Sequence, residues 1–369
     1  MKQTLNILRG WSWLMLLALL AGCSNDSDEP EPPQPENPKQ SLPLTFEVTE
    51  NPMIIDGAEN HQSTRTPITT FSEFNKFYLN YVYIEGNEPY SNDNTFVEAV
   101  KNQEDGKWVN SAGANEGWPI GVGVTVNWYA YTGYKGYNSE TDNVHFHSNS
   151  GNPYLDFTVD ANVARQHDLL VAQTSGTWND TSGILELNFN HVCSALRLFI
   201  KKSTNLSAYT LSVSNVTLCN VVNQGYYYFG TGTWTLTTSR TSYDIYPGSE
   251  PQTLGSTDYI PMDGDQSNNE ATHTYLFMIP QTLTAWNPTT HSVNTLIDNV
   301  TDKTYLKVKC TLTNTSTNPS TVVVNNDYVY IPFGASLAKG TQYDVKINIG
   351  KNSLYKYDKE THTYIKIIN

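Results

Sequence analysis

Two histidines in the run His145-Phe146-His147 have the spacing that a metal site can use. Side chains two positions apart in an extended strand lie on the same face, so both imidazoles are expected to point the same way. The neighbouring residues are asparagine and serine, and no third ligand follows nearby. The pattern therefore favours a solvated pair of histidines over a metal centre, and we expect no metal and no cofactor.

Acidic residues give no clearer sign of catalysis. Asp156, Asp160 and Asp168 can be paired on paper as the carboxylates of a glycosidase, but nothing in their spacing selects two of them. The sequence also lacks the Gly-x-Ser-x-Gly, His-Glu-x-x-His and phosphate-loop patterns of common enzymes. His191 lies in an apolar stretch, where a hydrogen-bonded structural histidine is expected. We predict that the protein is not an enzyme.

The thiol with the clearest predicted chemistry is that of Cys23. Basic Lys2 and Arg9 precede a long apolar run, which ends in small residues directly before Cys23. This layout predicts a secretory signal peptide at residues 1–22. The ending Leu20-Ala21-Gly22-Cys23 resembles the bacterial lipobox, which implies a lipidated Cys23 and a surface-exposed protein anchored in the outer membrane. A transmembrane helix is the alternative, but the run is too short to span a bilayer comfortably.

Residues 23–43 are predicted to form a lipidated, disordered tether. The segment 24–40 contains five prolines and no large apolar residue, so it cannot bury enough surface to offset its ordering entropy. Its acidic residues resemble the surface-export signal of Bacteroidetes lipoproteins, and a merely soluble acidic spacer explains them equally well. They are Asp26, Asp28, Glu29 and Glu31.

Composition narrows the class of protein further. The formal charge is −14, with 36 acidic and 22 basic residues, which argues against nucleic acid and anionic lipid as partners. Only 16% of the residues are charged, whereas tyrosine alone counts 24, a composition typical of β-proteins. About 325 residues remain after the tether, more than one hydrophobic core usually serves, so two domains are expected.

The remaining cysteines are expected to be structural. If Cys23 is lipidated, Cys193, Cys219 and Cys310 are left, and at least one of them cannot pair within the chain. Cys193 and Cys310 both lie in sequences typical of strands. We therefore predict small, buried apolar side chains rather than a disulfide or a reactive site.

Alternation of apolar and polar residues recurs along the chain and predicts an all-β fold of two tandem domains, each a sandwich or a barrel, with few short helices. We place these domains at residues 44–202 and 203–369, divided at a polar break near Lys202. Short helices are predicted at 70–73, from a capping box, and at 289–298. The predicted strands are 44–48, 76–84, 122–131, 185–189, 195–200, 209–219, 233–236, 274–279, 305–312, 322–331, 342–349 and 364–368.

Two aromatic runs, 128–134 and 226–229, allow two interpretations. Alternate members of each run must face opposite sides of a strand. One face of a run would then stack on sugars, which predicts a glycan-binding lipoprotein of a polysaccharide-uptake system as the alternative function. Core and cross-strand packing is the interpretation that we favour.

Four stretches together resemble the Bacteroidetes fimbrillin family, the lipoprotein subunits of type V pili. The first is the lipobox with its acidic spacer, and the second joins strand 44–48 to the run 64–71 around Arg65. The third joins 168–172 to 185–196, which is similar to the strand pair of the family that ends in Phe-x-His-x-x-Ser-Ala-Leu. The fourth joins 330–333 to 337–343, with a closing Leu-x-x-Gly-x-x-Tyr pattern. Each motif is weak alone, but their order and spacing extend from Cys23 to about Gly350.

The resemblance implies a fold and a route of assembly. Fimbrillins have two β-sandwich domains with transthyretin-like topology and are exported as lipidated precursors. An arginine-specific protease removes the first strand, and the opened groove accepts a strand from a neighbouring subunit in the fimbrium. The expected partners are therefore other pilus subunits, the protease, the outer membrane and a host protein or glycan, with adhesion as the role.

Residues of this chain can be matched to that route. Leu44, Phe46 and Val48 share one face of the first predicted strand, so they are expected to plug the groove. Arg65 is the only arginine between Gly22 and Lys76, in a polar segment, and is the predicted cleavage site. An ordinary surface arginine is the alternative.

The C-terminal tail, residues 351–369, has two interpretations of equal weight. It forms either a donor strand for a neighbouring subunit or the final strand of its own sandwich. If the tail is not a donor strand, a tip or anchor subunit is favoured over a stalk subunit. The candidate donor residues are Tyr364, Ile365, Ile367 and Ile368.

Overall fold

Extended strands dominate the computed structural model, which describes residues 44–51, 53–56, 75–85, 88–92, 96–111, 117–133, 143–246, 248, 250–262, 275–289, 303–361 and 363–368. The predicted signal peptide (1–22), the tether (23–43) with Cys23, the cleavage site Arg65 and the helix at 70–73 lie outside these residues. The same holds for residues 290–298 of the second predicted helix.

The all-β prediction is confirmed. Among the described residues the one α-helix is α1 (Trp178–Thr181), which begins where the Thr177 hydroxyl accepts a hydrogen bond from the Asp180 amide. No helix in this part of the chain has the length and apolar character needed to cross a bilayer. Single-turn 3₁₀ segments lie at η3 (Asn149–Gly151), η4 (Val163–Arg165), η5 (Thr204–Leu206) and η8 (Lys351–Ser353).

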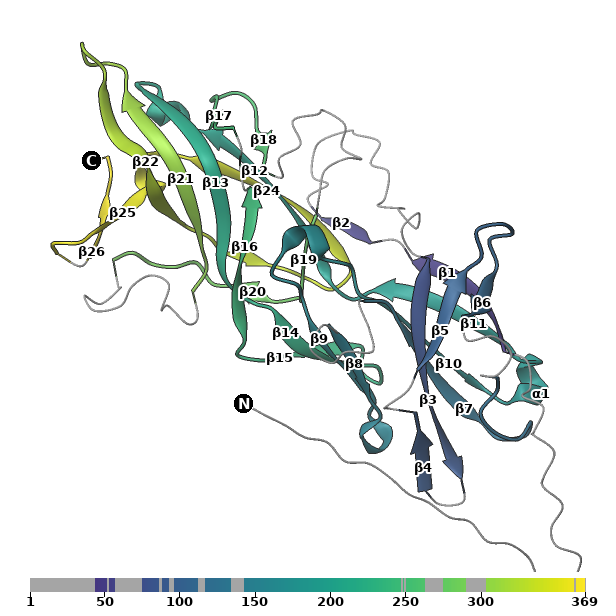
Figure 1. Ribbon diagram of the computed structural model, residues 1–369. Helices are drawn as coiled ribbons and strands as arrows, with labels where there is room; N and C mark the ends of the chain where they lie inside the picture. The colour runs from purple at the N-terminus through teal and green to yellow at the C-terminus, as the bar shows by residue number, and fades with distance from the viewer. Residues whose placement is uncertain are drawn as a thin grey trace, which may run out of the picture. The chain divides into compact units, whose positions relative to one another are not determined.

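The largest sheet closes on itself. Its strands follow the order β4-β3-β5-β6-β1-β11-β10-β7, and β7 also pairs with β3, so the seven strands from β3 to β7 form a complete ring (Figure 1). The strands are β1 (Thr45–Asn51), β3 (Lys76–Glu85), β4 (Glu88–Ser91), β5 (Val97–Lys101), β6 (Trp108–Asn110), β7 (Val126–Tyr131), β10 (Leu170–Gly176) and β11 (Ile184–His191).

Aromatic and aliphatic side chains fill the inside of the ring. Alternate residues of each strand point inward, so Phe77 and Leu79 of β3 lie inside, whereas Tyr78 faces the neighbouring core. Because a closed sheet leaves no unpaired edge, every strand of the ring is held on both sides. The inner core also includes Phe46, Trp108, Trp118, Trp128, Leu185, Leu187 and Phe189.

A second sheet is built around a parallel pair. β12 (Ser194–Lys202) runs beside β24 (Thr341–Ile349) over eight residue pairs, and the short β2 (Ile54–Asp56) pairs in parallel with the start of β24. Arg197 of β12 forms an ion pair with Asp344 directly across the pair, with both nitrogen–oxygen distances at 2.8 Å. β18 (Ile260–Pro261) and β19 (Leu276–Met278) cover the other edge of β12.

A third sheet lies against the second. Leu196, Leu198 and Ile200 of β12 share one apolar cluster with alternate residues of β13 and β21, as expected for two sheets that pack face to face. Its strands are β13 (Tyr209–Val222), β16 (Arg240–Tyr246), β17 (Gln252–Thr253), β21 (Tyr305–Asn314), β22 (Thr321–Pro332), β25 (Tyr355–Asp358) and β26 (Thr363–Lys366). A small pair, β20 (Thr282–Leu283) with β23 (Ala335–Ser336), completes this region.

Strand pairing crosses the domain boundary that we predicted near Lys202. The fourth sheet joins β8 (Val144–His147) and β9 (Tyr154–Thr158) to β14 (Gln224–Tyr228) and β15 (Thr233–Leu236). β12, on the N-terminal side of the boundary, pairs with β24 on the other side. The division into two domains and the transthyretin-like topology therefore stay predictions.

The cysteines of the described residues are buried and form no disulfide bond with one another. These are Cys193, Cys219 and Cys310, and burial raises the pKa of the Cys310 thiol to about 12. A thiol with so high a pKa carries almost no thiolate at neutral pH, so it is a poor nucleophile. The prediction of structural cysteines is confirmed.

Truncation of Phe46 tests how far the ring depends on β1. Phe46→Ala is expected to lower the free energy of unfolding by about 3–5 kcal/mol, because it removes a buried ring and leaves a cavity among aromatic neighbours. Urea denaturation measures this loss. Thr45→Ala, at the exposed neighbouring position, is the matched control and is expected to change stability by less than about 1 kcal/mol. Equal losses in both variants would contradict a packing role for β1.

Candidate functional site

The first strand of the chain lies inside the sheet rather than on its margin. β1 runs parallel to β11 over seven residue pairs, from Thr45↔Ile184 to Asn51↔Asn190, and on its other side Phe46 pairs with Trp108 of β6. Figure 1 shows it in purple within the ring. β1 is the segment that closes the ring between β6 and β11.

The three residues predicted to plug a groove lie on the inward face. Leu44 and Phe46 are buried, and half-buried Val48 packs against the same cluster. The Phe46 ring meets Phe77 edge-on at 5.4 Å between centroids, and Phe77 in turn contacts Phe189 at 5.2 Å. Removal of β1 would expose this aromatic cluster and leave the backbone donors of β11 without partners.

A second strand of the same segment was missed by the sequence reasoning. Only Pro52 and buried Met53 separate β1 from β2, which pairs with residues 341–343 of β24 in the neighbouring sheet. The apolar run Met53-Ile54-Ile55 was the sequence signal for it. Residues 45–56 therefore belong to two sheets at once, and both strands precede Arg65 in the chain.

A buried cluster of ionisable groups lies at one end of β1. His191 Nε2 is 2.5 Å from Glu50 Oε1 of β1, and His191 Nδ1 contacts Asp168 Oδ2, just before β10. The three side chains are only about a tenth exposed or less. His191 is thus the hydrogen-bonded structural histidine that we predicted, but the part of Glu50 was not foreseen, because the two residues are distant in sequence.

The two carboxylates hold a positive charge on the imidazole. Burial by itself lowers the pKa of His191, but hydrogen bonds and charges from Asp168 and Glu50 outweigh it and raise the pKa to about 9. Burial raises the pKa of Asp168, and its Oδ1 atom has no hydrogen-bond partner. At neutral pH the cluster is therefore an imidazolium held by the carboxylate on β1 and by Asp168.

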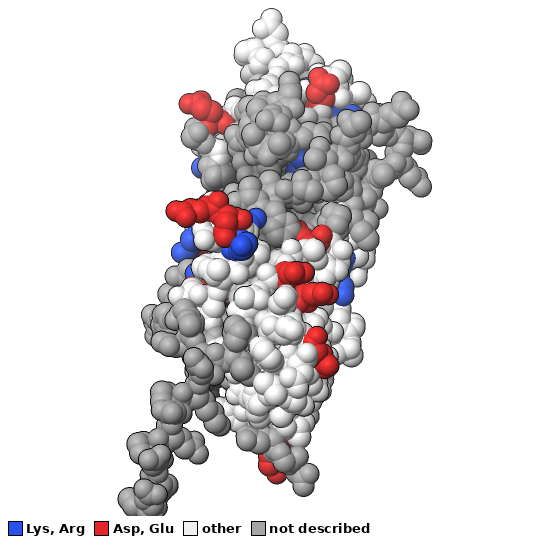
Figure 2. Space-filling model, turned by 90° about the vertical axis from the view of Figure 1, so that its right-hand side faces the viewer, with Lys and Arg blue, Asp and Glu red and all other residues white. Residues whose placement is uncertain are grey.

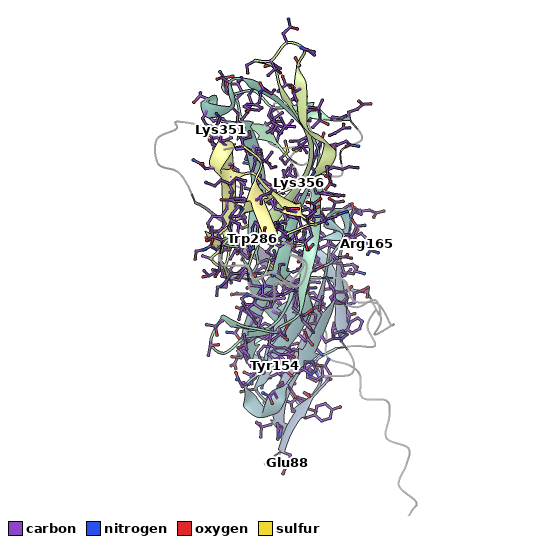
Figure 3. All side chains as sticks on the ribbon, turned by 90° about the vertical axis from the view of Figure 1, so that its left-hand side faces the viewer. Glu88, Tyr154, Arg165, Trp286, Lys351 and Lys356 are labelled. Atoms are coloured by element: carbon purple, nitrogen blue, oxygen red, sulfur yellow. The ribbon has the colours of Figure 1, made fainter. Side chains whose placement is uncertain are left out.

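The candidate donor strand folds back onto its own body. Tyr364 lies in β26, where its ring meets Trp286 at 4.7 Å and Tyr330 at 5.4 Å between centroids. Figure 3 shows the hairpin of β25 and β26 in yellow over Trp286. Ile365 is exposed, Ile367 is half-buried and Ile368 is buried. A donor role for these residues stays a prediction, and it would require Tyr364 to leave this aromatic cluster.

Tyrosines gather on the outer face of the fourth sheet. His147 stacks on Tyr154 at 4.7 Å between centroids with an 18° interplanar angle, and Tyr154 also contacts Tyr226 and Tyr228. All four side chains are half-buried. Beside them the Gln224 amide donates a 3.2 Å hydrogen bond to Asp156. We call His147, Tyr154, Tyr226 and Tyr228 the tyrosine face; Figure 3 labels Tyr154.

The two aromatic runs, 128–134 and 226–229, differ in how far their side chains are buried. In the first run Trp128 and Tyr131 are fully buried, so core packing is confirmed for them. In the second run Tyr227 and Phe229 are buried, whereas Tyr226 and Tyr228 point outward. His145 and His147 do share a face, as predicted. No group of three metal-ligating side chains lies among the described residues.

A cavity of about 410 Å³ lies between β12, β16 and η4. Its lining is mostly apolar, and its polar residues already have partners within the protein. Arg197 is paired with Asp344, Asp244 accepts hydrogen bonds from Asn215 and Thr217, and Asn162 caps η4. The cavity therefore offers no convergent set of polar groups for a ligand.

Charged side chains are scattered on the face shown in Figure 2. Acidic and basic residues there lie singly or in small groups among uncharged ones, and the described part of this face holds no continuous basic surface. Polyanions bind such continuous basic surfaces. The described part of this face therefore lacks the kind of surface that binds nucleic acid.

Comparison with known proteins finds one matching family model and several similar structures. A family model described as fimbrillin-like matches residues 64–363. A fimbrial protein from Bacteroides vulgatus has a similar structure with a TM-score of 0.51 and 18% identity, covering 84% of this chain and 96% of that one. This likeness shows a shared fold.

Other structures are similar at lower scores. A candidate cell adhesion protein from Bacteroides uniformis has a TM-score of 0.42 and 15% identity, over 86% of this chain and 96% of that one. Another from Parabacteroides distasonis has a TM-score of 0.46 and 9% identity, over 86% and 91%. The search of curated proteins finds no significant match.

The charge on His191 predicts a loss of stability at alkaline pH. A pKa raised from 6.5 to about 9 adds stability that is complete below about pH 6.5 and is lost as the pH rises through about 9. The difference corresponds to about 3 kcal/mol. The free energy of unfolding, measured with urea at about pH 6 and about pH 10, should fall by about that much more in the wild type than in His191→Gln. Parallel pH profiles would show that the cluster does not contribute.

Proposed function

The chain belongs to the fimbrillin-like family, and from this premise we propose that it is a non-catalytic fimbrial adhesion lipoprotein of the outer membrane that assembles by strand exchange. In this proposal Cys23 carries the lipid anchor, and the acidic tether holds the folded body away from the cell surface. The subunit takes its place in a type V pilus as a stalk, anchor or tip component.

The position of β1 is the observation that carries the proposal. A strand from near the start of the chain lies between β6 and β11, with Phe46 in the aromatic core of the ring. A cut after Arg65 would separate both β1 and β2 from the rest of the chain. The vacated site would then hold exposed apolar side chains and unpaired backbone groups, and a strand from another subunit satisfies both.

The family match supports this division of the chain. The matched region begins at residue 64, after β1 and β2, and ends at residue 363. The body after Arg65 thus coincides with the part of the chain that the family model describes. An arginine-specific protease acting at Arg65 would convert the precursor into a subunit with an open groove.

Limited digestion with an arginine-specific protease tests the proposal. We expect one early cut after Arg65, loss of the 24–65 segment by intact mass, and growth of oligomers by light scattering. Arg65→Lys is the matched control, since it keeps the positive charge but removes the arginine that the protease requires. A cut protein that remains a stable monomer, or an Arg65→Lys variant that polymerises equally, would overturn this route.

The tyrosine face supports a second candidate function, the binding of glycans at the cell surface. Its rings lie beside hydrogen-bonding groups. Tyr154 pairs with Tyr228 across β9 and β14, and two positions along the same strands Asp156 pairs with Tyr226. Flat rings with a nearby carboxylate and amide offer both apolar contact and hydrogen bonds to a pyranose ring. A half-buried position keeps these side chains within reach of a ligand.

Binding of soluble polysaccharides tests the second candidate. Tyr228→Ala is expected to weaken binding at least about tenfold in calorimetry, because the stacking surface is removed. Tyr328→Ala, an exposed tyrosine of β22, is the matched control and should bind as the wild type does. Absence of binding across a panel of host and dietary glycans, or equal affinity of both variants, would rule the tyrosine face out.

A further inference from the structure

One charged side chain lies on the inward face of β1. The face carries Leu44, Phe46, Val48 and, at the end of the strand, Glu50. A carboxylate in such a position is costly to bury unless it is paired. Glu50 meets this condition through His191, whose Nε2 atom is 2.5 Å from Oε1.

Departure of β1 would leave two of the three side chains of this cluster behind. His191 belongs to β11 and Asp168 precedes β10, so both stay with the body. Nδ1 of the imidazole would remain on Asp168, while Nε2 would point into the vacated site without its carboxylate. The empty groove would therefore combine an apolar floor with a hydrogen-bond donor at one end.

We propose that the strand which replaces β1 comes from a different pilus subunit and carries a carboxylate at the place of Glu50. Apolar side chains would occupy the places of Phe46, Val48 and Met53. This inference rests on the proposed function and specifies the partner of the same groove.

Charge complementarity favours a carboxylate over other side chains at this place. An apolar residue would leave the buried imidazolium without the carboxylate that now lies 2.5 Å from Nε2, and a lysine would face it with a second positive charge. A carboxylate also fixes the register, because a slip by two residues keeps the apolar face inward but moves the acid away from His191. The His191 imidazole at the end of the groove thus selects both the partner strand and its register.

The groove extends beyond the ring. After Glu50, Met53 is buried and β2 pairs with β24, so the same segment continues into the second sheet. A complete replacement would therefore be about 12 residues long, matching residues 45–56. The tail of this chain contains two carboxylates, Asp358 and Glu360, but it does not fit, because setting either one at the place of Glu50 puts Lys356 at the place of Val48 or Phe46. A different subunit is therefore the expected source of the strand.

The first test uses the full-length precursor and needs no cleavage. Glu50→Gln is expected to speed hydrogen exchange of the β1 amides at least about tenfold at neutral pH. Glu47→Gln is the matched control, since Glu47 lies on the same strand with an exposed side chain. In a His191→Gln background the effect of Glu50→Gln should largely vanish, as a double-mutant cycle requires of a direct pair. Equal exchange in Glu50→Gln and Glu47→Gln would overturn the inference.

The second test measures the partner directly. After arginine-specific cleavage, a synthetic peptide with the sequence of residues 44–56 should bind at least about tenfold more tightly than its Glu50→Gln version. The Glu47→Gln peptide should bind as the unchanged one, and a peptide of residues 354–368 should bind more weakly. Equal binding of all peptides would overturn the inference while strand exchange stands. Failure of cleavage would count against the proposed function alone, with hydrogen exchange still deciding the inference.

Discussion

The closed ring of strands depends on one parallel contact. β1 pairs with β11 along its whole length, but it meets β6 through a single residue pair. All other neighbours in the ring are antiparallel. Loss of this strand would expose the aromatic core of the ring to water. The stability of the ring therefore depends on a segment that the chain joins to the other ring strands at one end only, through residues 52–75.

Besides the backbone pairing, two kinds of side-chain interaction hold that segment, and they differ in how specific a chemical group they require. Phe46 contributes apolar contact within the ring, which any side chain of similar volume would supply. Glu50 contributes a buried ion pair with His191, which requires one chemical group at one place. The apolar contact supplies most of the affinity, while the ion pair distinguishes one strand from another. A groove with only the first kind of contact would accept any strand of alternating apolar residues.

The sequence predicted the long strands but not how they pair. The expected strands 76–84 and 209–219 agree closely with β3 (Lys76–Glu85) and β13 (Tyr209–Val222), because alternation over many residues is a strong local signal. β2 and β8 are only three and four residues long, so their signal is weak. The contact of Glu50 with His191 could not be foreseen, since it joins distant segments through strand pairing. Ring closure was missed for the same reason.

The covalent link between β1 and the body also favours β1 over any competing strand. A strand tethered to its own groove by a short connection has an effective concentration that reaches millimolar values. A free strand of another subunit, present at micromolar concentration, cannot compete with it even at equal intrinsic affinity. On the proposed route the intact precursor would thus remain monomeric, however many partners surround it. Cleavage of one peptide bond would then remove this advantage without any change in the groove itself.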